Sequence, residues 1–212
     1  MAGRLSSGVR CVSVVLFSCV MTSPQSNPYY ARWRAPLMAS KIASGEVIAC
    51  PAEGVWGLSC DPFSEQAVLT LLAMKHRAVD KGLIVVAADA AVFSEVLLPL
   101  PERVQKAIAL SWPGPNTWLV PHRGAFPDWV TGNSEDVAIR VTSAPALEAL
   151  CHALGGPVVS TSANPAGLAP PHRLWEVRRY FGPLLPALPG AIDPEGKPST
   201  IRRAGDGEVI RG

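Results

Sequence analysis

The chain has 212 residues, of which 48% are apolar and 17% are charged, and its formal net charge at pH 7 is +2. This length and apolar content predict one folded domain with a single sizeable core, and they exclude a largely disordered chain. The small net charge excludes a protein that is basic over its whole surface and binds nucleic acid in that way, although a local basic patch is compatible with it.

Cysteine usage indicates the redox compartment. The cysteines are odd in number and include no C-x-x-C pair: Cys11, Cys19, Cys50, Cys60 and Cys151. No cluster of histidines lies at metal-ligand spacing, so neither a disulfide framework nor a zinc site is expected. We expect buried free thiols in a reducing compartment, which favours a cytoplasmic protein.

The first 34 residues differ from the rest of the chain. Two arginines precede an apolar run, residues 11–21, that is too short to span a bilayer. This pattern is similar to a secretory signal, but no cleavage site with small residues follows it. We therefore expect residues 1–34 to be a disordered N-terminal extension, or the result of a start assigned too early, with Met21 or Met38 as the true first residue. No association with a membrane is expected.

Capping and turn signals divide the remaining residues, 35–212, into helices and strands. Apolar residues at helical spacing predict helices at 30–44 (with Pro36 in the first turn), 64–75, 102–110, 145–154 and 174–180. Short apolar runs bounded by glycine and proline predict strands at 46–50, 55–59, 83–87, 118–121, 136–141 and 157–162. The end of the chain predicts a hairpin that turns on Asp206-Gly207. Because helices and strands mix without a regular period, the predicted fold class is α/β, one domain with a twisted, mixed, open sheet and flanking helices.

Three cations surround the start of the apolar strand at 83–87. Lys75 and Arg77 lie at the end of a predicted helix, where the helix dipole favours positive charge, but Lys81 lies beyond that helix. A solvated patch is one explanation of this group, and a site for an anion is the other. The chain contains no Walker-type phosphate loop and no nucleophile elbow, so any phosphate would be held by side chains and strand-end amides.

Further segments could complete an anion site. Residues 160–164 (STSAN) follow an apolar strand and offer hydroxyls and an amide, although a capping turn would have the same composition. Arg140 lies in an alternating strand, so it points either to solvent or into a polar site, and its guanidinium suits carboxylate or phosphate. The terminal hairpin adds Ser199 and Arg211. Together these residues predict a concave, positively charged cleft without a covalent nucleophile.

Two carboxylates flank the strand at 55–59. Asp61 precedes a proline, which is typical of a turn. Glu53 could orient a cation, but no partner lies at a fixed spacing from it. The sequence therefore assigns neither carboxylate a role and predicts no resident metal site.

Six sequence strings occur in an order that is known from one protein family. They are CPAEGVWGLSCDP, KHRAVDKGL, WPGPNTWLV, AIRVT, VVSTSANPAG and PSTIRR…GEVIRG. On these strings the chain resembles the YrdC-like family in its short, single-domain bacterial form, and the resemblance spans residues 35–212. The resemblance implies a twisted, open α/β sheet with a positively charged concave face. It also implies synthesis of threonylcarbamoyl-adenylate and pyrophosphate from L-threonine, bicarbonate and ATP, for modification of tRNAs that read ANN codons.

The resemblance also implies which residues bind each substrate. The positions that lie on ATP in the family match Lys75, Arg77, Lys81, Ser162, Asn164 and Arg211. The positions that form the threonine site match Ala52, Arg140, Ser160 and Ser199. Mg²⁺ is expected with ATP, without a tightly bound organic cofactor. Since every reactant is anionic, catalysis would rest on positioning and charge neutralisation.

One residue departs from the family pattern. The family usually has Pro-Thr-Glu where this chain has Pro51-Ala52-Glu53, and that threonine contributes to the amino-acid site. Ala52 lacks the hydroxyl, and the loss of one neutral hydrogen bond costs about 0.5–1.5 kcal/mol. We therefore expect weaker or less selective binding of threonine.

Two other functions remain open. An RNA-binding module without catalysis could use the same basic face, although a net charge of +2 argues against strong binding at high salt. Carbamoyl transfer is the role of YrdC-like modules in hydrogenase-maturation proteins, whose zinc-finger cysteines have no counterpart in this sequence. Candidate partners beyond ATP, threonine and bicarbonate are tRNA and the other tRNA threonylcarbamoylation proteins.

Overall fold

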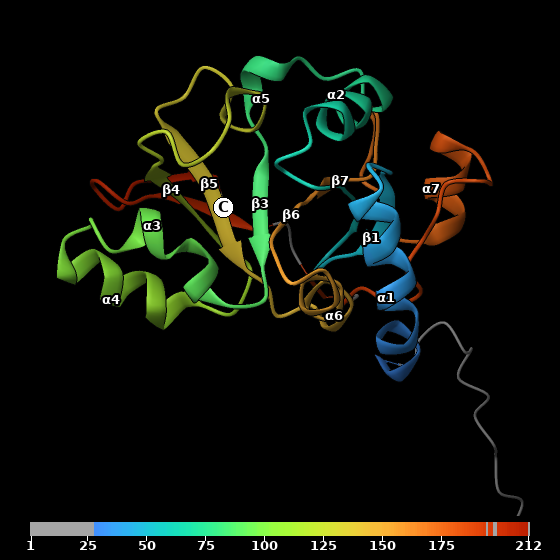
Figure 1. Cartoon of the computed structure of the whole chain (residues 1–212), viewed down its shortest axis with the longest axis horizontal. Coiled ribbons are helices and arrows are strands. Elements are labelled where there is room, and N and C mark those ends of the chain that lie inside the picture. Colours follow the sequence, from blue (N-terminus) through green and yellow to red (C-terminus); the bar gives the residue numbers. More distant parts are fainter. Residues whose placement is uncertain (1–27, 194, 197–198, 212) are drawn as a thin grey trace, which may run out of the picture.

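The computed structural model describes residues 28–193, 195–196 and 199–211 (Figure 1). Its α-helices are α1 Pro28–Ala43, α2 Glu65–Met74, α3 Ser94–Leu97, α4 Glu102–Ser111, α5 Asp128–Thr131, α6 Pro145–Leu154 and α7 Leu174–Phe181. Its strands are β1 Ile48–Pro51, β2 Trp56–Ser59, β3 Ile84–Ala87, β4 Asn116–Pro121, β5 Asp136–Val141, β6 Val158–Val159, β7 Thr161–Ser162, β8 Thr200–Arg203 and β9 Val209–Arg211. Short 3₁₀ turns occupy Val79–Lys81 and Ala90–Phe93.

The strands form two sheets. Six strands are arranged in the order β6-β3-β5-β4-β8-β9, and three in the order β1-β2-β7. In the larger sheet β3 runs parallel to β5 and antiparallel to β6, so the sheet is mixed. Figure 1 shows β3 between β5 and β6, with helices packed around the sheet. The predicted α/β class with a mixed, open sheet is confirmed, and the second sheet is an addition to it.

Most predicted elements are confirmed with ends shifted by no more than two residues. The hydroxyl of Ser64 caps α2 by accepting from the N–H of Ala67 at 3.4 Å. Gly155 ends α6 in the left-handed conformation, with φ of 72°. The terminal hairpin turns at Asp206 and Gly207, as predicted. These elements follow local signals, which is why the sequence was sufficient to predict them.

The strand predicted at 157–162 is wrong as a single element. Its first half, β6, pairs with β3 in the larger sheet, and its second half, β7, pairs with β2 in the smaller one. Ser160 lies between them, and its N–H donates to the carbonyl of Ile84 at 2.9 Å. Alternation along a strand cannot indicate a change of partner, because both halves have extended backbone. The chain therefore crosses between the two sheets at Ser160.

The first helix begins earlier than predicted, at Pro28. Pro36 consequently lies inside α1 and not in its first turn; it is exposed, so the carbonyl that it leaves unpaired faces solvent. The opposite face is buried from Ala31 to Ile42 and packs against α6 and β1. The domain boundary that we placed after residue 34 thus falls inside α1. The expectation for residues 1–27 lies outside the described residues.

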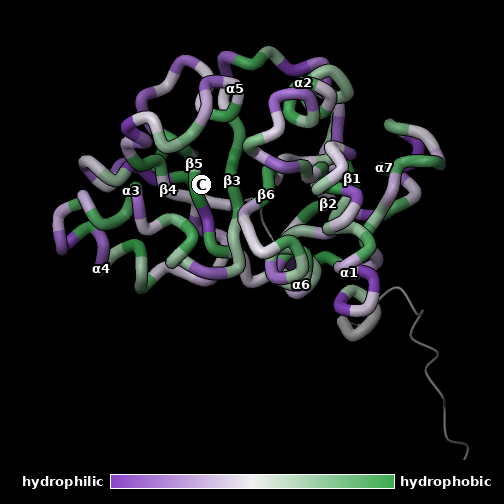
Figure 2. The backbone as a smooth tube through the Cα atoms, viewed as in Figure 1, coloured by the Kyte–Doolittle hydropathy of each residue, from purple (hydrophilic) through white to green (hydrophobic). Residues whose placement is uncertain are grey.

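Two buried apolar clusters hold the sheets and helices together. One lies around β3, β4 and β5 and includes residues of α2, α3, α4 and α7. The other joins α1, β1 and α6. Figure 2 shows β3 as hydrophobic, whereas the outer turns are hydrophilic. Along β5 the residues Val137, Ile139 and Val141 belong to the first cluster, so the intervening residues face the other side of the sheet.

Among the described residues, no helix combines the length and the apolar character that a bilayer crossing requires.

Candidate active site

A cavity of about 450 Å³ lies between the two sheets. One side is lined by alternate residues of β5 together with residues of β3, β4 and β8. The other side is lined by the turn between β1 and β2 and by residues 160–162, where the chain crosses between the sheets. This volume is in the range of pockets that bind small molecules.

Eight of the ten predicted site residues line this cavity: Ala52, Arg77, Lys81, Arg140, Ser160, Ser162, Ser199 and Arg211. They come from segments that lie far apart in the sequence and meet only in the folded chain. Lys75 and Asn164 are not among the lining residues. The cavity lining also includes the carboxylates Glu53 and Asp136.

Arg140 is a buried cation at the base of the cavity, with 5% of its surface exposed. Its Nη2 lies 3.0 Å from Oε2 of Glu53, and its Nε has no hydrogen-bond partner among the described residues. Burial lowers the pKa of Arg140, the carboxylate of Glu53 opposes that effect, and the charge of Arg211 adds to it. Arginine remains protonated at neutral pH even so. Glu53 therefore balances the charge of Arg140 but occupies only one end of its guanidinium group.

The sequence alone identified no partner for Glu53, but the structure does. Its side chain is 10% exposed, and besides Arg140 it contacts Thr142, whose hydroxyl donates to Oε1 at 2.7 Å. Thr142 is 89 positions away along the chain, so no local spacing could have revealed the pair. The only local signal was its place in a turn between two short strands.

Arg77 faces the cavity from the segment that follows α2. Its Nη2 donates to the carbonyls of Lys81 at 3.3 Å and Gly82 at 2.9 Å, and its Nε is buried without a partner among the described residues. Burial lowers the pKa of Arg77, and the charge of Arg211 lowers it further. Arg211 thus acts on both Arg77 and Arg140, which places all three guanidinium groups around one cavity.

The cations on this side have no acidic partner. In the described part of the chain, none of Arg77, Lys81 and Arg211 forms an ion pair with a carboxylate. Lys81 and Arg211 are exposed, and Arg211 donates to the carbonyl of Ser199 at 3.3 Å. Their charges therefore remain available to an anionic ligand. A net positive charge of the whole cleft remains a prediction.

The end of α2 explains why Lys75 and Arg77 point in different directions. His76 has φ of 49°, and the N–H groups of His76 and Arg77 donate to the carbonyls of Ala73 and Leu72. This is the Schellman arrangement, with histidine at the position that glycine usually occupies. The left-handed residue turns the chain between the two cations, so Arg77 reaches the cavity while Lys75 remains behind it.

Lys75 holds the turn that carries Ser162 and Asn164. It is 4% exposed, and its ammonium donates to the carbonyls of Ser162 and, at 2.8 Å, Asn164. Burial lowers the pKa of Lys75 to about 8, and the charge of Arg77 contributes. Asn164 in turn donates to the carbonyl of Leu168 at 2.6 Å. Lys75 and Asn164 thus stabilise the turn at residues 162–164 without lining the cavity.

Two of the serines that line the cavity are held by neighbouring groups. Ser160 and Ser199 are buried, and Oγ of Ser199 accepts from the hydroxyl of Thr117 at 3.0 Å. A Cβ atom at Gly57 would lie 3.1 Å from the carbonyl oxygen of Thr161 and 3.6 Å from Oγ of Ser160. Any larger residue at position 57 would therefore crowd the crossing segment where β2 approaches it. The sequence did not identify Gly57 or Thr117 as supports of these serines.

The donor set of the cavity suits a metal ion that arrives with phosphate. In the part of the chain that the structure describes, no group of three or more His, Cys, Asp or Glu side chains could hold a metal ion. Mg²⁺ bound to a nucleotide needs only one or two protein carboxylates, because phosphates and water supply the remaining oxygens. Asp136 lines the cavity and forms no ion pair among the described residues. It is the carboxylate that could serve this purpose.

Proteins with similar sequences are threonylcarbamoyl-AMP synthases. The enzyme of this name from Stutzerimonas stutzeri is 50% identical over 180 residues, which cover 84% of this chain and 97% of that protein. The Pseudomonas aeruginosa protein of the same name is 49% identical over the same shares of both chains.

Solved structures share the fold. The crystal structure of P. abyssi Sua5 complexed with L-threonine matches with a TM-score of 0.75 and 26% identity, over 81% of this chain and 51% of that one. The chain thus spans about half the length of that protein. The structure of E. coli YciO matches with a TM-score of 0.74 and 19% identity, over 85% of this chain and 89% of that one.

The match to a protein family covers most of the chain. Residues 40–212 match the family Sua5_yciO_yrdC, which is described as telomere recombination. This range contains the cavity and all ten predicted site residues. The chain therefore belongs to the Sua5_yciO_yrdC family, the YrdC-like family that its sequence strings resemble.

Proposed function

We propose that this chain is a threonylcarbamoyl-AMP synthase, a nucleotidyltransferase of the tRNA threonylcarbamoyladenosine pathway. Its curated relatives carry this name at about half identity over almost their whole length. The observation that carries the proposal is a cavity that brings together a buried guanidinium, serine hydroxyls and cations that form no ion pair with the described carboxylates. Such a cavity suits an amino acid and a triphosphate that must react with each other.

The reaction joins three reactants in two bond-forming steps. The amine of L-threonine forms a bond to the carbon of bicarbonate, and water leaves. An oxygen of the resulting N-carboxy group then attacks the α-phosphorus of ATP. The bond from that phosphorus to the bridging oxygen breaks, and pyrophosphate leaves with threonylcarbamoyl-AMP as the other product. No covalent intermediate with the protein is required, so the protein acts by positioning and charge neutralisation.

Threonine occupies the half of the cavity around Arg140 in this proposal. The unused donors of the buried guanidinium bind its carboxylate, and Ser160 and Ser199 contribute hydroxyls. Ala52 lines the same cavity and is 9% exposed, so it contacts the ligand without a hydroxyl. A relative solved with L-threonine supports an amino-acid site within this fold.

ATP occupies the other half. Arg77, Lys81 and Arg211 neutralise the phosphates, and Mg²⁺ held on those phosphates supplies further neutralising charge. Ser162 and Asn164 lie on the nucleotide side, and their turn is held by Lys75. In this proposal Lys75 supports ATP binding by holding that turn.

Measurement of pyrophosphate release tests this function. We expect release that requires ATP, L-threonine and bicarbonate together, with threonylcarbamoyl-AMP detected by mass spectrometry. Omission of any one substrate should abolish it. Release that does not depend on threonine would refute the proposal. Turnover of carbamoyl phosphate, or RNA binding without any turnover, would favour the two other functions.

We also propose the wider setting of the reaction. The product is passed on to tRNA with the help of other threonylcarbamoylation proteins. The thiols of Cys50, Cys60 and Cys151 are free and buried, which supports a reducing, cytoplasmic location. The catalytic domain in this proposal begins with α1, and residues before Pro28 are dispensable for activity.

A further inference from the structure

A buried carboxylate lies beside the cation of the amino-acid half. Glu53 lines the cavity, but both its oxygens are occupied: Oε2 lies 3.0 Å from Nη2 of Arg140, and Oε1 accepts from Thr142 at 2.7 Å. The side chains of Arg140 and Glu53 are 6% and 10% exposed, so water screens their attraction little. Their relative orientation is thus set by the protein.

The hydroxyl of Thr142 can point in only one direction. Its oxygen accepts from the N–H of Ala144 at 3.1 Å, and its single proton is directed at Glu53. The backbone of Thr142 is fixed as well, because its N–H donates to the carbonyl of Ala87 at 3.1 Å and so extends the pairing of β3 with β5. Thr142 is therefore a rigid donor that fixes one oxygen of the carboxylate.

The backbone of Glu53 is held from the opposite side. Its carbonyl accepts from the N–H of Asp193 at 2.9 Å, and a Cβ atom at Gly196 would lie 2.6 Å from the same carbonyl oxygen. Asp193 and Gly196 therefore pack closely against the turn that carries Glu53. Because both the backbone and the carboxylate of Glu53 are held by hydrogen bonds, Glu53 can keep the flexible side chain of Arg140 in one rotamer.

We infer that Glu53 is the positioning residue of the amino-acid half. Clamped by Thr142, it binds Nη2 of Arg140 and leaves the other terminal nitrogen of the guanidinium for the carboxylate of an α-amino acid. This inference rests on the proposed function, since it assumes that Arg140 binds threonine. The role inferred for Glu53 is orientation of Arg140 and not proton transfer, since each of its oxygens already accepts from a protein donor.

Two substitutions separate positioning from other roles. Glu53→Gln retains the shape of the side chain but removes its charge, and Thr142→Val removes the clamping hydroxyl while leaving Glu53 in place. We expect Glu53→Gln to weaken threonine binding about 10- to 150-fold, the range for a hydrogen bond to a charged group. Thr142→Val should weaken it about 2- to 12-fold, the range for a neutral one. Thr142→Ser retains the hydroxyl and should restore the affinity.

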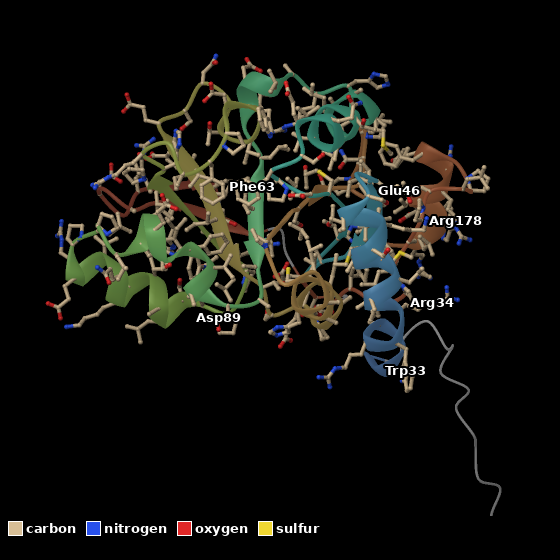
Figure 3. All side chains as sticks on the ribbon, viewed as in Figure 1. Trp33, Arg34, Glu46, Phe63, Asp89 and Arg178 are labelled. Carbon is tan, nitrogen blue, oxygen red and sulfur yellow. The ribbon has the colours of Figure 1, made fainter. Side chains whose placement is uncertain are left out.

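The readouts are the threonine Kd from calorimetry without ATP, and KM and kcat from pyrophosphate release. The KM for ATP should change less than twofold, because among the described residues Glu53 pairs with Arg140 and with none of the cations assigned to the phosphates. Glu46→Gln is the matched control: Glu46 is an exposed carboxylate that pairs with Lys41 and does not line the cavity, and Figure 3 shows it beside α1. It should leave all constants unchanged.

Three results would overturn the inference. Equal changes in the KM for threonine and ATP in Glu53→Gln and Thr142→Val would indicate general loosening of the fold. A loss confined to kcat, with an altered pH profile, would indicate that Glu53 transfers a proton. An unchanged threonine Kd in both variants would show that Arg140 does not need the clamp. If the wild-type chain binds threonine but releases no pyrophosphate, the proposed function fails while the positioning role is still tested by calorimetry.

Discussion

The two halves of the cavity hold their cations in different ways. Arg140 is buried, lies on a strand and is paired with a carboxylate that is itself clamped. Arg77 is half-buried, lies in the segment after a helix and donates only to backbone carbonyls. Charge on the Arg140 side is thus compensated within the protein, whereas charge on the Arg77 side is left for the ligand.

The proposed ligands would account for this difference. A small amino acid offers one carboxylate and few other contacts, so a cation that binds it gains from being oriented in advance. A triphosphate carries several charges, so it can be neutralised by several open cations. We therefore expect substitutions on the Arg140 side to affect stability and function together, and substitutions on the Arg77 side to affect function more than stability.

The largest effect is expected for Arg140→Met. It leaves Glu53 buried without a counter-charge, which typically lowers the free energy of unfolding by about 3–5 kcal/mol. The double variant Arg140→Met with Glu53→Leu should recover most of that stability, since an apolar pair of similar volume replaces a buried ion pair at little cost. Neither variant should bind threonine. Urea unfolding measures the free energy of unfolding, and calorimetry measures threonine binding. If Arg140→Met is as stable as the wild type, the contrast between the two halves does not hold.

The next effect is expected for Arg77→Ala. Removal of one preorganised donor from a developing charge typically costs about 100- to 1,000-fold in kcat. Arg77→Lys should also fail substantially, because a point charge does not replace the planar fork of the guanidinium. Stability should fall less than in Arg140→Met, since Arg77→Ala removes two hydrogen bonds to backbone carbonyls but leaves no buried carboxylate without its counter-charge. Pyrophosphate release at varied concentrations of ATP measures the effect. The control is Arg103→Ala on α4, which lies outside the cavity. If Arg77→Ala turns over like the wild type, the assignment of Arg77 to the phosphates is wrong.

Lys75 predicts a pH dependence of stability. Its pKa is lowered from 10.5 to about 8 by burial and by Arg77. Between these pH values the unfolded chain carries one more proton than the folded chain, so this group makes stability rise with pH there. The slope is at most about 1.4 kcal/mol per pH unit. Urea unfolding of wild type and Lys75→Met from pH 7.5 to 10.5 should show this slope only in the wild type; parallel curves would show that the lysine titrates normally.

The smallest effect is expected for Ala52→Thr. The added hydroxyl supplies a neutral hydrogen bond in the amino-acid half and should lower the KM for threonine about 2- to 12-fold. Discrimination against other amino acids should sharpen, with the kcat for threonine and the KM for ATP little changed. Titration of threonine and serine against both proteins measures this. Unchanged constants for both substrates would place position 52 outside the amino-acid site.

Much of the fold was predictable because it depends on residues close together in the sequence. The strands at 83–87 and 136–141 follow from their apolar content and alternation, and the helix at 145–154 from its spacing and its glycine end. Arg77 and Lys81 were identified because a cluster of cations beside a buried strand is uncommon in a chain with so few charges. These signals are local, and local backbone preferences preserve them in the folded state.

The pairing of distant segments was decided by the tertiary structure alone. The chain crosses between two sheets at Ser160, although the backbone is extended on both sides of it. Glu53 receives its partners from β5 and the residue after it, and Lys75 is turned away from the cavity by the left-handed backbone of His76. Periodicity and composition determined which side chains were candidates. Which of them share one cavity, and which support it from behind, was determined only when segments far apart in the sequence packed together, because a local pattern carries no information on the partner of a strand or of a buried charge.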